Sequence, residues 1–278
     1  MARLIVEQTP HPGWFNMAAD AYTASIVGEG GAPSVVRFYT WSPPAVSLGY
    51  HQPPNAVNLD ACRKLNWDVV RRPTGGRALL HKGDLCYSVA IPAETSNLNT
   101  LRNLYQQIAL AIRDAVQAMG ILTKDPTDLS RLPKSDVKLH AGLCLDSRVR
   151  GEVATDSGKF AAAAQRVFQG SILQHGSILI DSDPGEIAQV IHGDRRTIAA
   201  GLRARACSLE KAAGHTIAMN ELIANLVNEF SQRLEMEFQQ SAWTEEELTQ
   251  IARLKGDWAI MSSDSNLDEV VSHVKQPA

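Results

Sequence analysis

The segment RRPTGGRALLH, from Arg71 to His81, constrains the fold most strongly, because two adjacent glycines interrupt a run of strand-forming residues. Apolar residues precede it at Trp67 and 69–70 and follow it at 85–91, a pattern that predicts a turn between two strands. Glycine lacks a Cβ, so the backbone there can adopt φ > 0 and approach a ligand closely. Arginine offers a rigid fork of donors to carboxylate, phosphate or carbonyl oxygens. The pattern fits either a binding loop for a partly anionic ligand or a plain solvated hairpin.

Composition excludes several classes of protein. The chain has 278 residues, 44% of them apolar, which is enough for an ordinary buried core. Its net charge is −3 and it contains no long basic stretch, so we expect no nucleic-acid partner. No uncharged segment approaches the roughly 20 residues that span a bilayer, and the N-terminus lacks a signal-peptide core. We therefore expect a cytoplasmic protein with no membrane partner.

The four cysteines, Cys62, Cys86, Cys144 and Cys207, are scattered and show no C-x-x-C pair. Their spacing matches no set of metal ligands, so no metal site is expected. Cys62 lies in a predicted short helix over 57–64 and Cys86 on a predicted strand. Cys62 is expected to be a small buried hydrophobe, and Cys86 is expected to lie on a sheet face, opposite Leu85 and Tyr87, as a structural residue.

Hydrophobic periodicity predicts strands in both halves of the chain and helices between and after them. Alanine has a high helix propensity, but for the run at 161–164 the short distance to a turn near Gln169-Gly170, together with the resemblance described below, favours a strand. Residues 262–278 lack a core pattern, so we expect one domain over 1–261, a loose tail over 262–278, and a monomer. The expected strands are 4–7, 35–39, 45–48, 85–91, 159–165 and 171–180, and the expected helices are 16–27 (capped by Asn16), 98–119, 217–234 and one opened by a capping box at Thr244 and Glu247.

Three motifs resemble the lipoate-protein ligase and octanoyltransferase family, which is related to the biotin protein ligases. They are Arg37–Tyr50, Arg71–His81, and a stretch that holds Gly158-Lys159, Gln165-Arg166 and residues 173–179. They occur in the family's order, and the resemblance covers roughly residues 15 to 240. It implies an α/β fold of the α+β kind, with a mixed, largely antiparallel twisted sheet and flanking helices.

The same resemblance implies a nucleophile. In the octanoyltransferases of this family that act through a cysteine, a lysine follows the cysteine by about fifteen residues, and Cys144 and Lys159 occupy matching places. A neighbouring ammonium lowers the pKa of a thiol and stabilises charge that develops on an attacked carbonyl. Without the motif, Cys144 would be interpreted as a buried hydrophobe and Lys159 as an exposed strand-end lysine.

Further motif residues are expected to line the substrate site. The family's Gly-Ser before Ala-Gln is Ala162-Ala163 in this chain, a change that narrows an acyl slot by a methyl group and removes a hydroxyl. The implied substrate-binding residues are Arg37, Arg72, Thr74, Gly75, Gly76, Arg77, His81, Ala162, Gln165 and His175.

The implied activity moves an octanoyl group from acyl carrier protein to a lysine of a lipoyl-domain protein, through a Cys144 acyl-enzyme. Glycine cleavage H protein and 2-oxoacid dehydrogenase E2 are acceptors of this type. Thioester-to-amide transfer runs downhill, so no cofactor is expected. Three alternatives stay open: an ATP-dependent lipoate-protein ligase, which would need ATP and Mg²⁺, an octanoyl amidotransferase between lipoyl proteins, and a non-catalytic acyl-binding protein.

Overall fold

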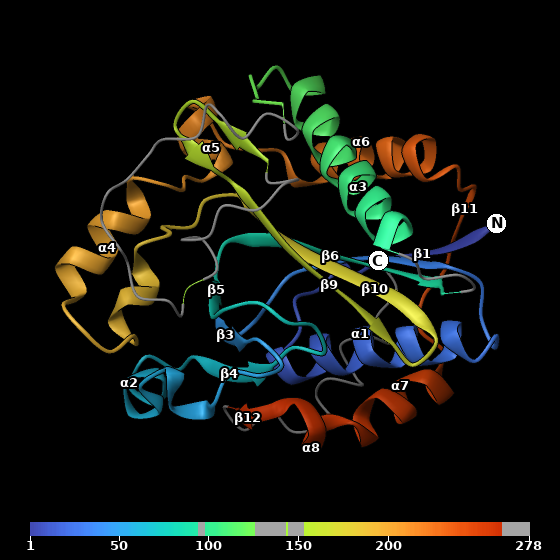
Figure 1. Ribbon diagram of the computed structural model, residues 1–278, viewed down its shortest axis with the longest axis horizontal. Coiled ribbons are helices and arrows are strands. Elements are labelled where there is room, and N and C mark those ends of the chain that lie inside the picture. The colour runs from blue at the N-terminus through green and yellow to red at the C-terminus, as the bar shows by residue number, and fades with distance from the viewer. Residues whose placement is uncertain (94–97, 126–142, 144–152, 263–278) are drawn as a thin grey trace.

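The computed structural model describes residues 1–93, 98–125, 143 and 153–262. In this part of the chain the strands form a six-stranded sheet, a four-stranded sheet and a two-stranded ribbon. Helices cover both faces of the six-stranded sheet (Figure 1). Most neighbouring strands in the three sheets run antiparallel, and the rest run parallel. The predicted mixed, largely antiparallel α/β fold is confirmed.

The strands of the larger sheet are, in spatial order, β11 (Phe238–Gln240), β1 (Ala2–Val6), β2 (Val35–Tyr39), β6 (Asp84–Pro92), β10 (Ser171–Leu179) and β9 (Ala161–Phe168). The pairings of β1 with β11 and β2 are parallel, whereas the strands from β2 to β9 alternate in direction. The β9–β10 hairpin turns at Gln169 and Gly170, which have φ of 48° and 80°. The alanine run therefore forms a strand, as predicted.

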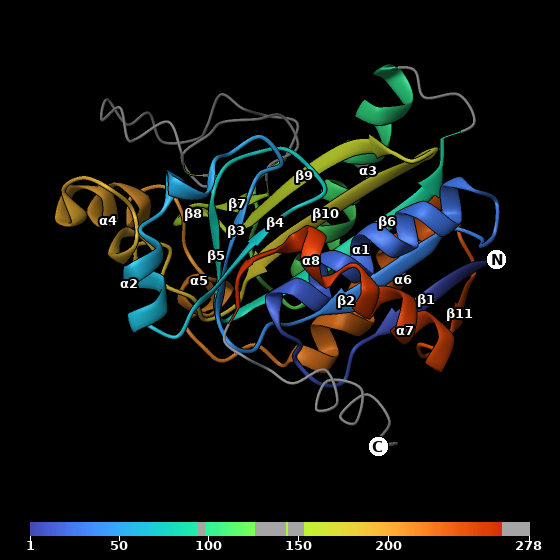
Figure 2. The ribbon, with the colours of Figure 1, turned by 90° about the horizontal axis from the view of Figure 1, so that it is seen from below.

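Two helical layers enclose this sheet. Helices α3 (Leu98–Ala118) and α6 (Met219–Leu234) pack on one face, and α1 (Gly13–Gly28) packs on the other. Figure 2 shows α7 (Glu245–Arg253) and α8 (Lys255–Trp258) lying against α1 on that second side. The predicted helices over 98–119 and 217–234 are thus confirmed, as is the capping box at the start of α7.

Helix α1 begins three residues earlier than predicted, at Gly13, after Pro12. The prediction that Asn16 caps this helix is wrong, because the Asn16 side chain makes tertiary contacts. Its Oδ1 accepts from Arg37 Nη2 at 2.6 Å and its Nδ2 donates to Thr40 O at 3.1 Å. Asn16 therefore fastens helix α1 to β2 and to the residue that follows it, and does not cap the helix.

The four-stranded sheet explains the course of the segment 72–78, which we call the central segment. The strand order is β12 (Ala259–Met261), β4 (Asp68–Arg71), β3 (Ala45–Leu48) and β5 (Leu79–His81). Because β3 lies between β4 and β5, the central segment passes over the end of β3, and the plain-hairpin alternative is wrong. An ideal Cβ on Gly49 would lie 2.0 Å from Gly76 O, so only glycine fits beneath the crossing.

The remaining elements are short. Helix α2 (Leu59–Lys64) confirms the predicted short helix, and its Cys62 packs with α4 (Arg195–Arg203) in one apolar cluster. The ribbon pairs β7 (Ala154–Thr155) with β8 (Gly158–Lys159). The other short elements are α5 (Leu209–Ala213) and 3₁₀ turns at Pro54–Ala56 and Glu186–Gln189.

Several predicted segments lie wholly or partly outside the described residues. These are the loop over 122–140, the apolar stretch 141–146 that includes Cys144, and the tail over 262–278. The domain boundary at 261 and the monomeric state stay predictions. Across the described ranges, no helix combines the length and apolarity needed to cross a bilayer.

Candidate active site

A small pocket is bounded by both large sheets and by the central segment, and we call it the cavity. Helix α1 contributes Met17 to it, and β9 contributes three consecutive alanines. Four of the predicted site residues line it, namely Arg72, His81, Ala162 and His175. The full lining is Met17, Tyr39, Trp41, Arg72, Leu79, His81, Cys86, Ala162, Ala163, Ala164, His175, Gly176 and Ser177.

Arg72 fixes the shape of the central segment. Its Nη1 donates to the backbone oxygen and to the hydroxyl of Ser47, both at 2.7 Å, and its Nη2 donates to Gly75 O at 3.1 Å and Arg77 O at 2.9 Å. The guanidinium is buried and thus folds the glycine turn around itself. The prediction that the segment is a binding loop fits this arrangement, with Arg72 as its internal support.

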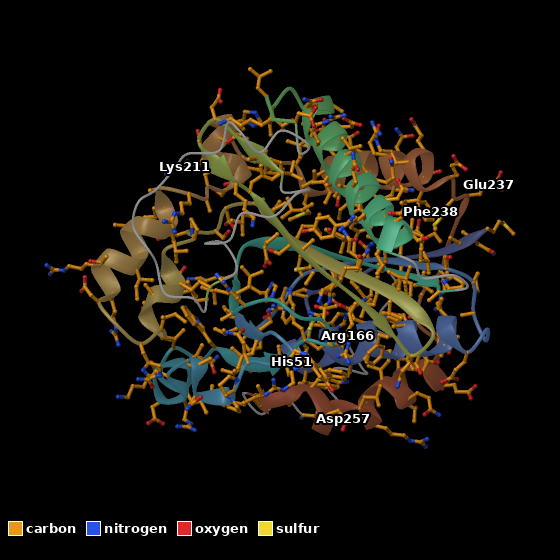
Figure 3. The ribbon with its side chains drawn as sticks, viewed as in Figure 1. His51, Arg166, Lys211, Glu237, Phe238 and Asp257 are labelled. Carbon is orange, nitrogen blue, oxygen red and sulfur yellow. The ribbon has the colours of Figure 1, made fainter. Side chains whose placement is uncertain are left out.

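Arg166 supports the central segment from β9. Arg166 is labelled in Figure 3. Its Nη1 donates to Pro73 O at 2.9 Å, and its guanidinium lies 4.0 Å from the centre of the Tyr50 ring. Arg71 holds the other side, since its Nη1 donates to the carbonyls of Tyr50 at 2.8 Å and Gln52 at 2.7 Å. The arginines of the motif therefore organise backbone around the cavity.

A buried chain of hydrogen bonds joins Asp20 on α1 to the central segment. Asp20 Oδ2 lies 2.8 Å from His175 Nδ1, and His175 Nε2 lies 2.6 Å from Thr74 Oγ1. Burial lowers the pKa of His175, which keeps the imidazole neutral at neutral pH. The carboxylate then accepts from Nδ1–H, and Nε2 accepts the proton of the Thr74 hydroxyl.

A second carboxylate, Asp84, organises the opposite wall. Its Oδ2 lies 2.7 Å from His81 Nδ1 and accepts from Ser177 Oγ at 2.6 Å. His81 Nε2 lies 2.7 Å from Ser47 Oγ, and its ring stacks on Trp41 with centroids 4.0 Å apart. Both imidazoles that line the cavity are therefore fixed by partners behind its wall.

Cys86 completes this second wall, as a thiol on the α1 face of the sheet. Trp41 Nε1 donates to its Sγ at 3.1 Å. Burial, together with the charge of Asp84, raises the pKa of Cys86 well above its usual value. The side chain lies on a sheet face, as predicted, where it is buried and also lines the cavity.

Most polar side chains of the wall contact one of two carboxylates. His175 and the Tyr39 hydroxyl contact Asp20, and His81 and Ser177 contact Asp84. Asp84 Oδ1 is buried and has no hydrogen-bond partner among the described residues. Met17, Leu79 and alanines of β9 complete the lining, which suits a hydrocarbon chain.

Arg37, a predicted substrate-binding residue, does not line the cavity. Its guanidinium is fully buried between Glu7 (3.0 Å) and Asp20 (3.1 Å) and lies 4.0 Å from the centre of the Tyr39 ring. Burial alone would raise the pKa of Asp20, but the hydrogen bond from His175 and the charge of Arg37 lower it below its usual value. Arg37 therefore holds the Asp20 carboxylate ionised behind the site.

The other predicted substrate-binding residues lie outside the cavity lining, four of them in the central segment and Gln165 on β9. Gly76 has φ of +94°, which glycine adopts without strain, and its ideal Cβ would lie 3.9 Å from Ala164 Cβ. Gly75 and Arg77 are half-buried beside it. Gln165 Nε2 donates to Gln174 Oε1 at 3.0 Å on the neighbouring strand.

Lys159 is buried, with 5% of its surface exposed, so it is not the exposed strand-end lysine of the alternative interpretation. Its backbone bonds to Arg205 O at 2.9 Å and Cys207 N at 3.0 Å. Cys144 lies outside the described residues, but Leu143 is buried and forms a bridge with Ala78. The chain therefore passes beside the central segment at the residue before the predicted nucleophile.

Sequence reasoning missed both carboxylates and Ser47. Asp20 stands among alanines on a helix whose start is buried, and a lone charge in such a run was the available signal. Asp84 opens a strand that is otherwise apolar. Ser47 alternates with buried residues on β3, where a serine carries no distinctive pattern.

Comparisons with known proteins agree with this fold. The family model described as "Lipoyl protein ligase A/B catalytic domain" matches residues 12–231. A protein of Brevibacillus brevis named octanoyltransferase LipM is 31% identical over 253 residues, which cover 88% of this chain and 91% of the relative. A Staphylococcus epidermidis protein of the same name is 29% identical, covering 87% of this chain and 90% of the relative.

Solved structures show the same fold. A crystal structure of lipoate-protein ligase A bound with ATP gives a TM-score of 0.72 at 21% identity, covering 92% of this chain and 94% of that one. The bipartite lipoate protein ligase of Thermoplasma acidophilum gives 0.71 at 22% identity, covering 92% of each chain.

Gly49→Ala should destabilise the protein by about 2 kcal/mol, because the new methyl group would collide with the backbone oxygen of Gly76 and displace the central segment. Urea unfolding measures this loss. Gly256→Ala is the matched control, since a Cβ there meets no atom within 4 Å. Unchanged stability of Gly49→Ala would show that the central segment leaves β3 at little cost.

Protonation of Glu7 at low pH should lower the free energy of unfolding. The Glu7 carboxylate accepts from Arg37 Nε at 3.0 Å and from Trp243 Nε1 at 2.6 Å. Burial alone would raise the pKa of Glu7, but the His11 hydrogen bond and Arg37 lower it from 4.5 to about 2. The stabilisation, about 3 kcal/mol, is therefore complete above pH 4.5 and is lost as the pH falls toward 2.

Urea unfolding at several pH values tests this prediction. Glu7→Gln should be less stable than wild type at pH 7, and the difference should shrink between pH 4.5 and 2. Glu29→Gln, at an exposed position, is the control and should follow the wild-type pH dependence. A constant difference between Glu7→Gln and wild type would contradict the assignment.

Proposed function

Because the chain belongs to the lipoyl protein ligase A/B catalytic-domain family, we propose that it transfers an octanoyl group from acyl carrier protein to a lysine of a lipoyl-domain protein. The relatives named octanoyltransferase, aligned over most of the chain, confirm the predicted enzyme class. The observation that carries the proposal for the substrate is the apolar cavity beneath the central segment.

The cavity supports an acyl substrate by its surface. Side chains alternate along β9, so Ala162 and Ala164 share the face opposite to that of Ala163, and each presents a methyl group where a larger side chain would fill space. A saturated eight-carbon acyl chain gains about 0.8 kcal/mol for each buried methylene, or roughly 5 kcal/mol in total. Burial on this scale is enough to bind the chain and to distinguish its length.

Cys144 is the proposed nucleophile. Its thiolate attacks the thioester carbonyl of the donor, the thiolate of the carrier leaves, and an acyl-enzyme forms. The amine of the acceptor lysine then attacks this second thioester, so that an amide forms and Cys144 is released. The bridge between Leu143 and Ala78 supports this assignment, because Ala78 immediately precedes Leu79 of the cavity wall.

Lys159 is the proposed cation of the reaction, since its buried side chain lies three residues before Ala162, the first residue of β9 in the cavity wall. An ammonium near the attacked carbonyl stabilises the oxyanion and the attacking thiolate. Backbone N–H groups of residues 75–77 are proposed as further donors to the oxyanion.

The proposal needs no ATP, since both steps exchange one acyl bond for another without activation. An ATP-dependent lipoate ligase is the main alternative, and the ligase structures share only the fold at this level of identity. An amidotransferase between lipoyl proteins would use the same cysteine and cavity, and differs in its donor alone. Glycine cleavage H protein and 2-oxoacid dehydrogenase E2 are the acceptors to test.

Cys144→Ala should abolish octanoyl transfer, because no acyl-enzyme can form. Intact-protein mass spectrometry after mixing with octanoyl-acyl carrier protein, without ATP, should detect one octanoyl adduct on wild type and none on the variant. Cys62→Ala, which removes a buried thiol in another cluster, should keep the adduct. An adduct on Cys144→Ala would refute the covalent mechanism, and AMP release from ATP and octanoate would favour the ligase.

Lys159→Ala should slow formation of the acyl-enzyme by about 100-fold or more, since the thiolate and the oxyanion lose a cation worth roughly 3 kcal/mol. Single-turnover acylation followed by mass spectrometry gives the rate. Lys64→Ala, at an exposed position on α2, is the control and should acylate at the wild-type rate. A folded Lys159→Ala protein with wild-type acylation would remove this residue from the chemistry.

A further inference from the structure

His81, Asp84 and Cys86 bring an imidazole nitrogen, a carboxylate oxygen and a sulfur together at one point, all three side chains being buried. Nδ1 and Oδ2 are 2.7 Å apart, Sγ and Nδ1 3.4 Å, and Sγ and Oδ2 3.3 Å. The circle through these atoms has a radius of about 1.8 Å, which is shorter than zinc bonds of roughly 2.0–2.3 Å. One ion lying just off their plane can therefore contact all three.

Each of these side chains also has an outer partner of the kind that orients metal ligands. His81 Nε2 lies 2.7 Å from Ser47 Oγ, Ser177 Oγ donates to Asp84 Oδ2 at 2.6 Å, and Trp41 Nε1 donates to Cys86 Sγ at 3.1 Å. Such partners fix the ring orientation of a ligating histidine and stabilise a thiolate. The three candidate ligands are thus each held in place by a hydrogen bond with a neighbouring residue.

The second oxygen of Asp84 is the independent observation. Oδ1 is buried and has no hydrogen-bond partner among the residues that the structure describes. A buried carboxylate oxygen without a donor is costly, and natural proteins rarely leave one unsatisfied. Because Oδ1 shares the carboxylate with Oδ2, a cation held by His81 and Cys86 lies within reach of it.

We propose that His81, Asp84 and Cys86 form a binding site for a thiophilic divalent cation of the Zn²⁺ class. The thiol of Cys86 releases its proton to solvent on binding, and the proton of His81 then resides on Nε2 and is donated to Ser47 Oγ. Three protein ligands leave a fourth position, which faces the cavity because His81 and Cys86 line it.

A cation bound at this site should inhibit acyl transfer. An ion at this wall occupies space that the acyl chain would fill, so it should compete with the acyl donor. This consequence rests on the proposed octanoyl transfer, whereas the binding site does not. The spacing His-x-x-Asp-x-Cys contains a single cysteine and therefore lacks the paired cysteines from which a metal site is usually predicted.

Cobalt binding to the full-length chain tests the site without any acyl substrate. After treatment with a chelator, wild type should bind one Co²⁺ and show the near-ultraviolet charge-transfer band of a cobalt–thiolate bond. Cys86→Ser and Asp84→Asn should each lower the affinity by at least about 100-fold, and Cys86→Ser should abolish the band. Cys62→Ser, at a buried cysteine outside the cluster, should bind as wild type does.

Thermal melting first establishes that each variant is folded. If Cys86→Ser is unfolded, Asp84→Asn serves as the test variant in its place. Absence of the band in wild type, or a band that persists in Cys86→Ser and is lost in Cys144→Ser, would overturn the proposal. Zn²⁺ should also raise the apparent KM of the wild type for the acyl donor. The apparent KM of Cys86→Ser should be the same with and without Zn²⁺. A failure of acyl transfer would leave the cobalt result interpretable.

Discussion

The buried carboxylate of Asp20 is the charge on which the arrangement of the site depends. It is fully buried on α1 and contacts Arg37 and Tyr39 of β2 and His175 of β10. An isolated carboxylate at this depth would be strongly destabilising, but a paired and hydrogen-bonded one is tolerated. Asp20 therefore specifies how the helix sits on the sheet, because any other placement would leave its charge unpaired.

Asp20 also fixes the position of the central segment, because His175 bonds to both Asp20 and Thr74. The segment has little secondary structure of its own, and its glycines would let it adopt many conformations. Thr74 attaches it to the six-stranded sheet, while Arg72 attaches it to Ser47 of the four-stranded sheet. The cavity between the sheets thus has a wall whose position is set by two side chains that belong to the loop.

Local signals predicted the elements whose formation is local. Helix α3 follows from its apolar period, α7 from its capping box, and the β9–β10 hairpin from Gln169-Gly170. The insertion of β3 between β4 and β5 could not be predicted in this way, because strand order depends on contacts between residues far apart in sequence. The same limit hid Asp20 and Asp84, whose partners come from other elements. The motifs located Arg72, Thr74, His81 and His175 because resemblance carries information about tertiary contacts that periodicity lacks.

The replacement of the family's Gly-Ser by Ala162-Ala163 is consistent with this network. A serine hydroxyl at position 163 would lie against the apolar cluster beneath α3, where it would need a hydrogen-bond partner. Alanine removes that requirement, and Ala162 adds a methyl group to the apolar cluster beside the cavity. On the other walls of the cavity, Asp20 and Asp84 hold the imidazoles of His175 and His81. The preference of the cavity for an acyl chain therefore depends as much on Asp20 and Asp84 as on the residues that line the cavity.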